Sequence, residues 1–295
     1  MPSVRFKNYI HLHFIVFIWG FTAVLGALIT VDAVPLVWYR MLLATFFIFV
    51  YLLLKKKSYK VTAKMLMGYS FAGLLIALHW LAFFKAIKVS NVSVTLAMMS
   101  TGAFFTALLE PIFYKRKFIW YEFFFGLVVI LGLYIIFNVE GDYKEGIVYG
   151  LVAALLSAIF SIINGQYAKR YDASVISFYE LLVGVVCITI YLTFTGGFSL
   201  AFFQLPTMDW LWLTILALFC TTYAFIASVA VMKYLSPYTV MLTINLEPVY
   251  GILLAFLVFG KKEQMQPGFY YGAVIILATV VANGIIKNSK KSKTA

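Results

Sequence analysis

Glu247 is the charged residue whose surroundings point most directly to chemistry. It lies near the middle of TVMLTINLEPVYGILLAFLVFG, a run that contains no other charge. If this run crosses a bilayer as a helix, its carboxylate lies deep in the membrane, where a charge is costly and usually serves a function. Pro248 lacks an N–H group, so the carbonyl of Ile244 is left without its helical partner. The pair indicates a site for a substrate amine or a coupled proton; the alternative is a hydrogen bond that stabilises a kink.

Other ionisable residues lie inside apolar runs. Arg40, in VPLVWYRMLLATFF, suits a two-pronged grip on a carboxylate or phosphate, unless it snorkels to the headgroups. His79 suits proton exchange or hydrogen bonding, and Trp80 beside it offers an apolar wall with one donor. Glu180 aligns with Arg40 when the second spans of the two halves are superposed. Inverted halves would hold them about 12 Å apart along the membrane normal, so we expect separate partners.

Three further side chains are weaker candidates for substrate binding. Tyr250 shares the helical face of Glu247, whereas Asn245, two residues before Glu247, points elsewhere. Trp19 is a cavity candidate in the first apolar run. No phosphate loop, metal-ligand spacing or Ser/His/Asp arrangement is visible, so we expect no metal, no cofactor and no enzymatic activity.

The composition indicates a membrane protein. Hydrophobic residues make up 64% of the chain and charged residues only 12%, whereas soluble domains carry about 25% charged residues. The net charge of +12 could suggest a nucleic-acid partner. The basic residues cluster in short loops between apolar runs, however, which is typical of contact with a lipid bilayer and argues against nucleic acid.

The apolar runs predict an all-α protein with ten membrane-spanning helices, because a span needs about 20 apolar residues. With the N-terminus inside, the inner segments hold 17 Lys and Arg residues and the outer loops hold 5. This bias places both termini in the cytoplasm of a cell whose inner membrane holds the chain. Asp209 then falls in an outer loop. The predicted spans are 9–29, 34–54, 65–86, 90–114, 119–138, 146–167, 174–195, 210–232, 237–259 and 268–287.

The chain also contains an internal repeat. Shifting the sequence by 146 residues places the segment that begins at Ser90 over the one that begins at Ser236, without a gap. Gly102 falls over Pro248, so two equivalent helices carry a weak point. Each half, 1–140 and 141–295, holds five predicted spans, and an odd number inverts the second half. Transporters with such repeats bind their substrate near the membrane midplane between the halves.

Three segments together resemble a known family. They are YIHLHFIVFIWGFTAVLGALI, HWLAFFKAIKVSNVSVTLAMMSTGAFFTALLEPIFYKRK and the closing run from Leu235, and they are similar to the EamA-like family of the drug/metabolite transporter superfamily. The resemblance implies an alternating-access carrier with a central cavity framed by the first four helices of each half. It also implies peripheral fifth and tenth helices that pack on other helices or on a second copy, as in a homodimer. Two departures are Thr101-Gly102 in place of Ser-Pro, and Ser157 in place of Trp.

We therefore expect a secondary transporter for a small polar organic solute, such as an amino acid or related metabolite, with efflux favoured by the resemblance. One alternative is an intramembrane enzyme that modifies lipid, which the scattered single charges disfavour. The other is a membrane scaffold that transports nothing, for which Glu247→Gln would be silent.

Overall fold

The computed structural model describes residues 4–115, 120–139 and 141–292, which form helices joined by short connections and contain no β-strand. Arg116 and Lys117 of the predicted inner turn, and residue 140 at the predicted boundary between the halves, lie outside the described residues. The elements are α1 (Val4–Leu28), α2 (Ala33–Leu54), α3 (Ala63–Val89), α4 (Val92–Met99), α5 (Gly102–Phe113), α6 (Trp120–Val139), η1 (Gly141–Tyr143), α7 (Lys144–Tyr167), α8 (Ala173–Phe194), α9 (Leu200–Phe203), α10 (Thr207–Ile215), η2 (Leu216–Tyr223), α11 (Ala224–Val231), α12 (Pro237–Ile244), α13 (Glu247–Phe259), η3 (Gly260–Glu263) and α14 (Pro267–Ser292).

Within the described residues, eight helical segments are long and apolar enough to cross a membrane. α6 and α14 contain two shorter apolar stretches, 124–138 and 267–283. The prediction of an all-helical multi-pass membrane protein is therefore confirmed, with eight of the ten expected spans matched by helical segments of spanning length. Helices suit lipid because they satisfy every interior backbone hydrogen bond within one segment.

Two of the spanning segments are interrupted near their middle. The first is divided into α4 and α5, and α5 begins at Gly102; the second is divided into α12 and α13, with Pro248 in the first turn of α13. Glycine weakens a helix through its backbone entropy, and proline removes a backbone donor. A third irregularity, which the sequence did not predict, is the π-helix η2 between α10 and α11.

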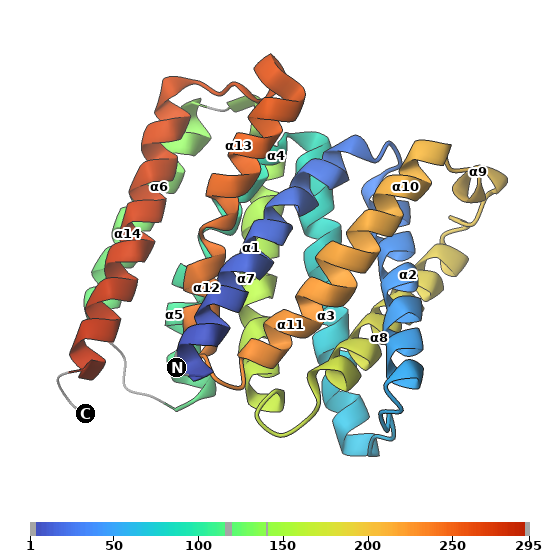
Figure 1. Cartoon of the computed structure of the whole chain (residues 1–295). Coiled ribbons are helices and arrows are strands. Elements are labelled where there is room, and N and C mark those ends of the chain that lie inside the picture. Colours follow the sequence, from blue (N-terminus) through green and yellow to red (C-terminus); the bar gives the residue numbers. More distant parts are fainter. Residues whose placement is uncertain (1–3, 116–119, 140, 293–295) are drawn as a thin grey trace.

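The helices pack as one bundle around a core shared by both halves of the sequence. α3 packs against α7 and α8, α2 against α8, and α1 against α13, so the main contacts join residues far apart in the chain. α6 and α14 pack on each other at one edge of the bundle (Figure 1). α1 begins and α14 ends at the same end of the bundle, and α1 and α7 run in opposite directions (Figure 1).

Two buried carboxylates from the second half cap turns of the first half. The carboxylate of Asp209, on α10, accepts hydrogen bonds from the N–H and hydroxyl groups of Thr30 at 3.0 and 2.7 Å and from the N–H of Val31 at 3.3 Å. Glu263 accepts from the first two N–H groups of α4 at 3.1 and 2.9 Å and from the Ser93 hydroxyl at 2.7 Å. Asp209, expected in an outer loop, is thus a buried residue of a helix, because unpaired N–H groups at a turn favour a carboxylate.

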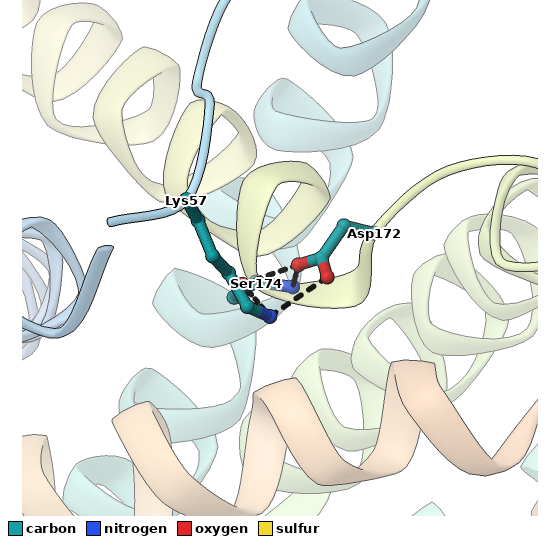
Figure 2. Close-up of polar contacts among 3 residues, drawn as sticks. All are labelled: Lys57, Asp172 and Ser174. Atoms are coloured by element: carbon teal, nitrogen blue, oxygen red, sulfur yellow. Dashed lines mark hydrogen bonds and ion pairs between the residues drawn. The ribbon is translucent and has the colours of Figure 1, made fainter. Parts of the chain in front are cut away.

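An ion pair joins two loops at one end of the bundle. Lys57 Nζ lies 2.7 Å from Asp172 Oδ2, and Asp172 also caps α8 by accepting from the N–H of Ser174 at 2.9 Å (Figure 2). Burial alone would raise the pKa of the Asp172 carboxyl. The hydrogen bonds from Lys57 and Ser174 outweigh that effect and hold its pKa below its ordinary value of 3.8.

Two variants separate the cap at Asp172 from the ion pair. Asp172→Ala removes both and is expected to lower the free energy of unfolding by about 1 kcal/mol. Asp172→Asn keeps a capping oxygen and loses the charge; because the two side chains are 33% and 44% exposed, screening limits its cost to less than about 1 kcal/mol.

The pH dependence follows from the sign of the shift. Because the carboxyl has a lower pKa in the folded state, its stabilisation is present above the ordinary pKa and disappears as pH falls through the lowered one. The difference in unfolding free energy between the wild type and Asp172→Asn, followed in detergent from about pH 7 to about pH 3, should therefore shrink towards the acid end. A constant difference across that range would contradict the assignment.

Two glycines allow α6 and α14 to touch along their backbones. A Cβ atom added to Gly132 would lie 3.0 Å from the carbonyl oxygen of Gly272, and one added to Gly272 would lie 2.7 Å from that of Gly132. Small residues permit such close approach between helices in lipid. An added Cβ would also meet an isoleucine side chain, Ile276 at 2.7 Å or Ile136 at 2.6 Å. These side chains can shift, whereas the backbone oxygen at each position cannot rotate away.

Gly272→Ala is accordingly expected to destabilise the protein by about 1–3 kcal/mol through overpacking. The matched control is Val274→Leu, an exposed position on the same helix that should change stability by less than about 0.5 kcal/mol. Thermal unfolding of both purified variants checks the prediction, and equal melting temperatures would refute it.

Candidate functional site

A cavity of about 70 Å³ lies at the centre of the bundle. Of the residues predicted from the sequence, Trp19, Arg40, His79, Trp80 and Glu247 line it, whereas Glu180, Asn245 and Tyr250 do not. Aromatic, small polar and charged side chains share the wall. The full lining is Trp19, Thr22, Arg40, His79, Trp80, Phe83, Met99, Ser157, Phe160, Ser161, Asn164, Cys220, Phe225, Ser228, Val229, Met232, Ile244 and Glu247.

Arg40 is held in the cavity wall by one hydrogen bond and two aromatic rings. It is only 2% exposed, and its Nε donates to the Thr221 hydroxyl at 2.7 Å. Its guanidinium carbon lies 3.8 Å from the centre of the Trp80 ring and 5.3 Å from that of Phe84, so both rings stabilise the cation. Nη1 is buried and has no hydrogen-bond partner in the described structure. Arg40 therefore retains a free donor, and it does not snorkel to solvent.

Glu247 is the first residue of α13 and is 7% exposed. Its carboxylate lies at a helix N-terminus, where the helix dipole favours negative charge. Arg40 is near enough for the two opposite charges to attract each other. No ion pair within 4.0 Å joins these two described side chains, however. Arg40 and Glu247 thus line the same cavity without forming an ion pair with each other.

His79 and Trp19 each bind a backbone carbonyl. His79 Nδ1 lies 2.7 Å from the Ala153 oxygen, and because a carbonyl only accepts, Nδ1 carries the proton. In the neutral ring Nε2 is then an acceptor. Trp19 Nε1 donates to the Cys220 carbonyl at 3.0 Å. These bonds fix the orientation of both rings at the cavity wall.

The π-helix η2 supplies the acceptors for two of these side chains. Cys220 binds Trp19 through its carbonyl, and Thr221 binds Arg40 through its hydroxyl. The Thr221 hydroxyl also donates to the Leu216 carbonyl, five residues earlier, at 2.8 Å. π-Helical turns frequently occur at functional sites, because they redirect backbone groups that an α-helix would occupy.

A row of small polar residues on α7 lines the cavity; the sequence suggested Asn164 as a weaker cavity candidate but not Ser157 or Ser161. Ser157, Ser161 and Asn164 all line the cavity. Their spacings of four and three residues place them on one face of a helix. That periodicity inside an otherwise apolar span is the signal that could have identified them.

The three remaining candidates lie behind the cavity wall. Glu180 is completely buried and accepts from Asn164 Nδ2 at 3.3 Å, with no ion pair to Arg40 among the described atoms. Asn245 lies in the break between α12 and α13, and neither atom of its amide has a partner in the described structure. Tyr250 packs edge-on against Phe17 of α1, with ring centres 5.5 Å apart.

The lining offers little to a metal ion. No group of three or more His, Cys, Asp or Glu side chains lies together in the part of the chain that the structure describes. One cation, one carboxylate and several aromatic rings around a central cavity are instead suited to binding an organic molecule that carries both charges.

Comparison with known proteins decides the family. The sequence model of the EamA-like transporter family matches residues 8–138 and again residues 144–284. The chain belongs to this family. The family is part of the drug/metabolite transporter superfamily, and the chain is a multi-pass membrane protein of this family.

Individual relatives are distant. A protein of Archaeoglobus fulgidus described as an uncharacterized transporter is 25% identical over 52% of this chain, and the match spans only 53% of that relative. An uncharacterized transporter of Clostridium kluyveri is 24% identical over 81% of this chain and 78% of its own. A protein of known crystal structure has the same fold, with a TM-score of 0.70 over 95% of this chain and 98% of its own at 12% identity.

Thr221→Val tests how Arg40 is held. The variant leaves a buried charged donor unpaired, and the expected loss of stability is about 1.5–3 kcal/mol. The neighbouring Thr222→Val is the matched control, because Thr222 makes only a neutral bond of 3.4 Å to Ala44 and should cost about 1 kcal/mol or less. Thermal unfolding followed by tryptophan fluorescence compares them, and a larger loss for Thr222→Val would exclude this role for Thr221.

Proposed function

We propose that the protein is a secondary carrier that moves a small zwitterionic organic solute, such as an amino acid, by alternating access. The observation that carries the proposal is the pair of buried, opposite charges of Arg40 and Glu247 at one central cavity, without an ion pair between them. Burying two such charges costs free energy unless each gains a partner. A solute with a carboxylate and an amine supplies both partners at once.

Each part of such a solute has a matching group in the cavity. The free Nη1 donor of Arg40 suits the carboxylate, and Glu247 suits the amine or a coupled proton. His79 adds an acceptor at Nε2, and the rings of Trp80 and Phe160 form apolar walls for a side chain. The chemical class is therefore an amino acid or a related metabolite.

The cavity must expand before it can accept such a solute. A volume of about 70 Å³ holds a few water molecules, whereas small-molecule pockets usually measure about 300–1,000 Å³. The helix breaks before Gly102 and Pro248 are the natural points for this movement, because backbone changes concentrate at the ends of helices. The described conformation then corresponds to a contracted state of the transport cycle.

The proposed topology is ten spans in two inverted halves of five. Three observations support it: the family matches the chain twice, the breaks at Gly102 and Pro248 are separated by the repeat length, and α1 and α7 run in opposite directions. The contacts also correspond, because α1 packs on α13 as α7 packs on α4 and α5. Inverted halves allow one half to take the conformation of the other, which opens the site to opposite sides of the membrane.

The proposed orientation places both termini in the cytoplasm and the chain in the inner membrane. The excess of Lys and Arg in the predicted inner segments supports it, and α1 and α14 begin and end at one end of the bundle (Figure 1). The proposed direction of net solute movement is efflux, which rests on the family resemblance. We also propose that two copies form a homodimer through the edge formed by α6 and α14.

Solute flux in reconstituted vesicles tests the function. Wild-type protein should carry at least one of a panel of radiolabelled amino acids and nucleosides. Glu247→Gln keeps the shape of the side chain and removes its charge, so it should weaken solute binding by roughly tenfold to a hundredfold, the equivalent of about 1.5–3 kcal/mol. The melting temperature should change little, because no described partner loses an ion pair.

Asp172→Asn serves as the control, because it removes a carboxylate from a loop outside the cavity and should leave flux intact. Flux that is equal in wild type and Glu247→Gln would refute the proposed site. Chemical change of a vesicle lipid without any flux would instead support a lipid-modifying enzyme, and silence in every assay would support a scaffold.

A further inference from the structure

Glu180 lies in a second group of buried polar side chains, which adjoins the central cavity at Asn164. One of its carboxylate oxygens accepts a hydrogen bond from Asn164, and the other, Oε1, has no partner among the described protein atoms. Three further oxygens nearby share this condition: Oδ1 of Asn164, Oγ of Ser177 and the hydroxyl of Tyr69. All four side chains are at most 1% exposed.

These oxygens come from α3, α7 and α8, and α3 packs against both of the other helices. Ser177 precedes Glu180 by three residues, so both lie on the same face of α8. The backbone of α3 touches α8 at this level, since a Cβ added to Gly73 would collide with the carbonyl oxygen of Glu180. Tyr69 lies one turn before Gly73, with its ring 5.2 Å from that of Tyr167 and 6.3 Å from that of Tyr179, the residue before Glu180.

No protein cation balances this carboxylate. The only polar group that binds Glu180 in the described structure is the amide of Asn164. The ion pair in the described structure, between Lys57 and Asp172, lies in the loops (Figure 2). A buried carboxylate needs a counter-charge, and buried oxygens need donors or a cation. Hard cations take oxygen ligands of the kinds gathered here, namely carboxylate, amide carbonyl and hydroxyl oxygens.

We propose that Glu180, Asn164, Ser177 and Tyr69 form a binding site for a sodium ion. A single carboxylate balances the charge of a monovalent cation and leaves a divalent one half neutralised. A proton on Glu180 would satisfy that carboxylate alone, whereas a metal ion contacts all four oxygens at once. Glu180, Ser177 and Tyr69 line none of the described pockets, so an organic cation has no space beside these three side chains.

Asn164 connects the sodium site to the central cavity. Its amide nitrogen binds Glu180, and its side chain also lines the cavity. Occupancy of the ion site therefore fixes one wall of the solute site, which couples the two ligands. This coupling rests on the proposed function, whereas sodium binding itself does not.

Binding of radioactive ²²Na⁺ to the purified wild-type protein tests the site. Ionic strength is held constant with N-methylglucamine chloride, so that only sodium varies. Saturable binding is expected in the wild type and in the control Asp172→Asn. Glu180→Gln should abolish it, and Ser177→Ala, which removes one neutral ligand, should weaken it by roughly tenfold. A single elution peak and a cooperative melting curve show that each variant is folded.

The outcomes separate this inference from the proposed function. No saturable sodium binding in the wild type, or equal binding in Glu180→Gln, overturns the sodium site, including the case in which only a proton binds. Solute flux that depends on Glu247 but never on sodium overturns the coupling and leaves the carrier standing. Sodium binding that is lost in Glu180→Gln, in a protein without any solute flux, supports the ion site and counts against the carrier.

Discussion

The structure depends on placing charges inside a bundle whose outer surface is apolar. Arg40, Glu180 and Glu247 are all buried, while large apolar side chains are exposed on the outer faces of the helices. Lipid cannot solvate a charge, so each of these groups relies on what the surrounding helices provide. Irregular points in the helices supply this polar environment. Glu247 begins α13 after a helix break, and Arg40 donates to a hydroxyl of the π-helix η2.

The ends of the bundle and its centre differ in how well their polar groups are satisfied. At the ends, Asp209 and Glu263 accept several hydrogen bonds each from turns in the other half of the sequence. In the centre, Arg40, Asn164 and Asn245 all retain buried polar atoms without a partner in the described structure. Satisfied polar groups are normal in a protein interior, so the unsatisfied centre is the place where a ligand gains the most by binding.

Part of this arrangement could be predicted from the sequence because it depends on single residues. A lone charge in an apolar run identified Glu247 and Arg40 for the cavity, and Gly102 and Pro248 fell beside helix breaks because glycine and proline act on their own backbone. The resemblance to the EamA-like family was confirmed over both halves.

The rest depends on which helices meet. η2 contains neither glycine nor proline, and its hydrogen bonds involve α1 and α2, which lie far away in the sequence. Asp209 seemed to belong to a loop because its partners, in the turn after α1, are equally distant. Glu180 was recognised as a polar candidate, but the oxygens around it come from three helices whose packing no local pattern specifies.

The glycine contact between α6 and α14 has a mechanical consequence. These two helices touch backbone to backbone and contact each other more extensively than either contacts any other helix. In the proposed transport cycle, such a tightly packed pair would move as one rigid unit at the edge of the bundle. The interrupted helices beside it could then tilt while α6 and α14 keep their positions, so that the area that the protein occupies in the bilayer stays nearly constant.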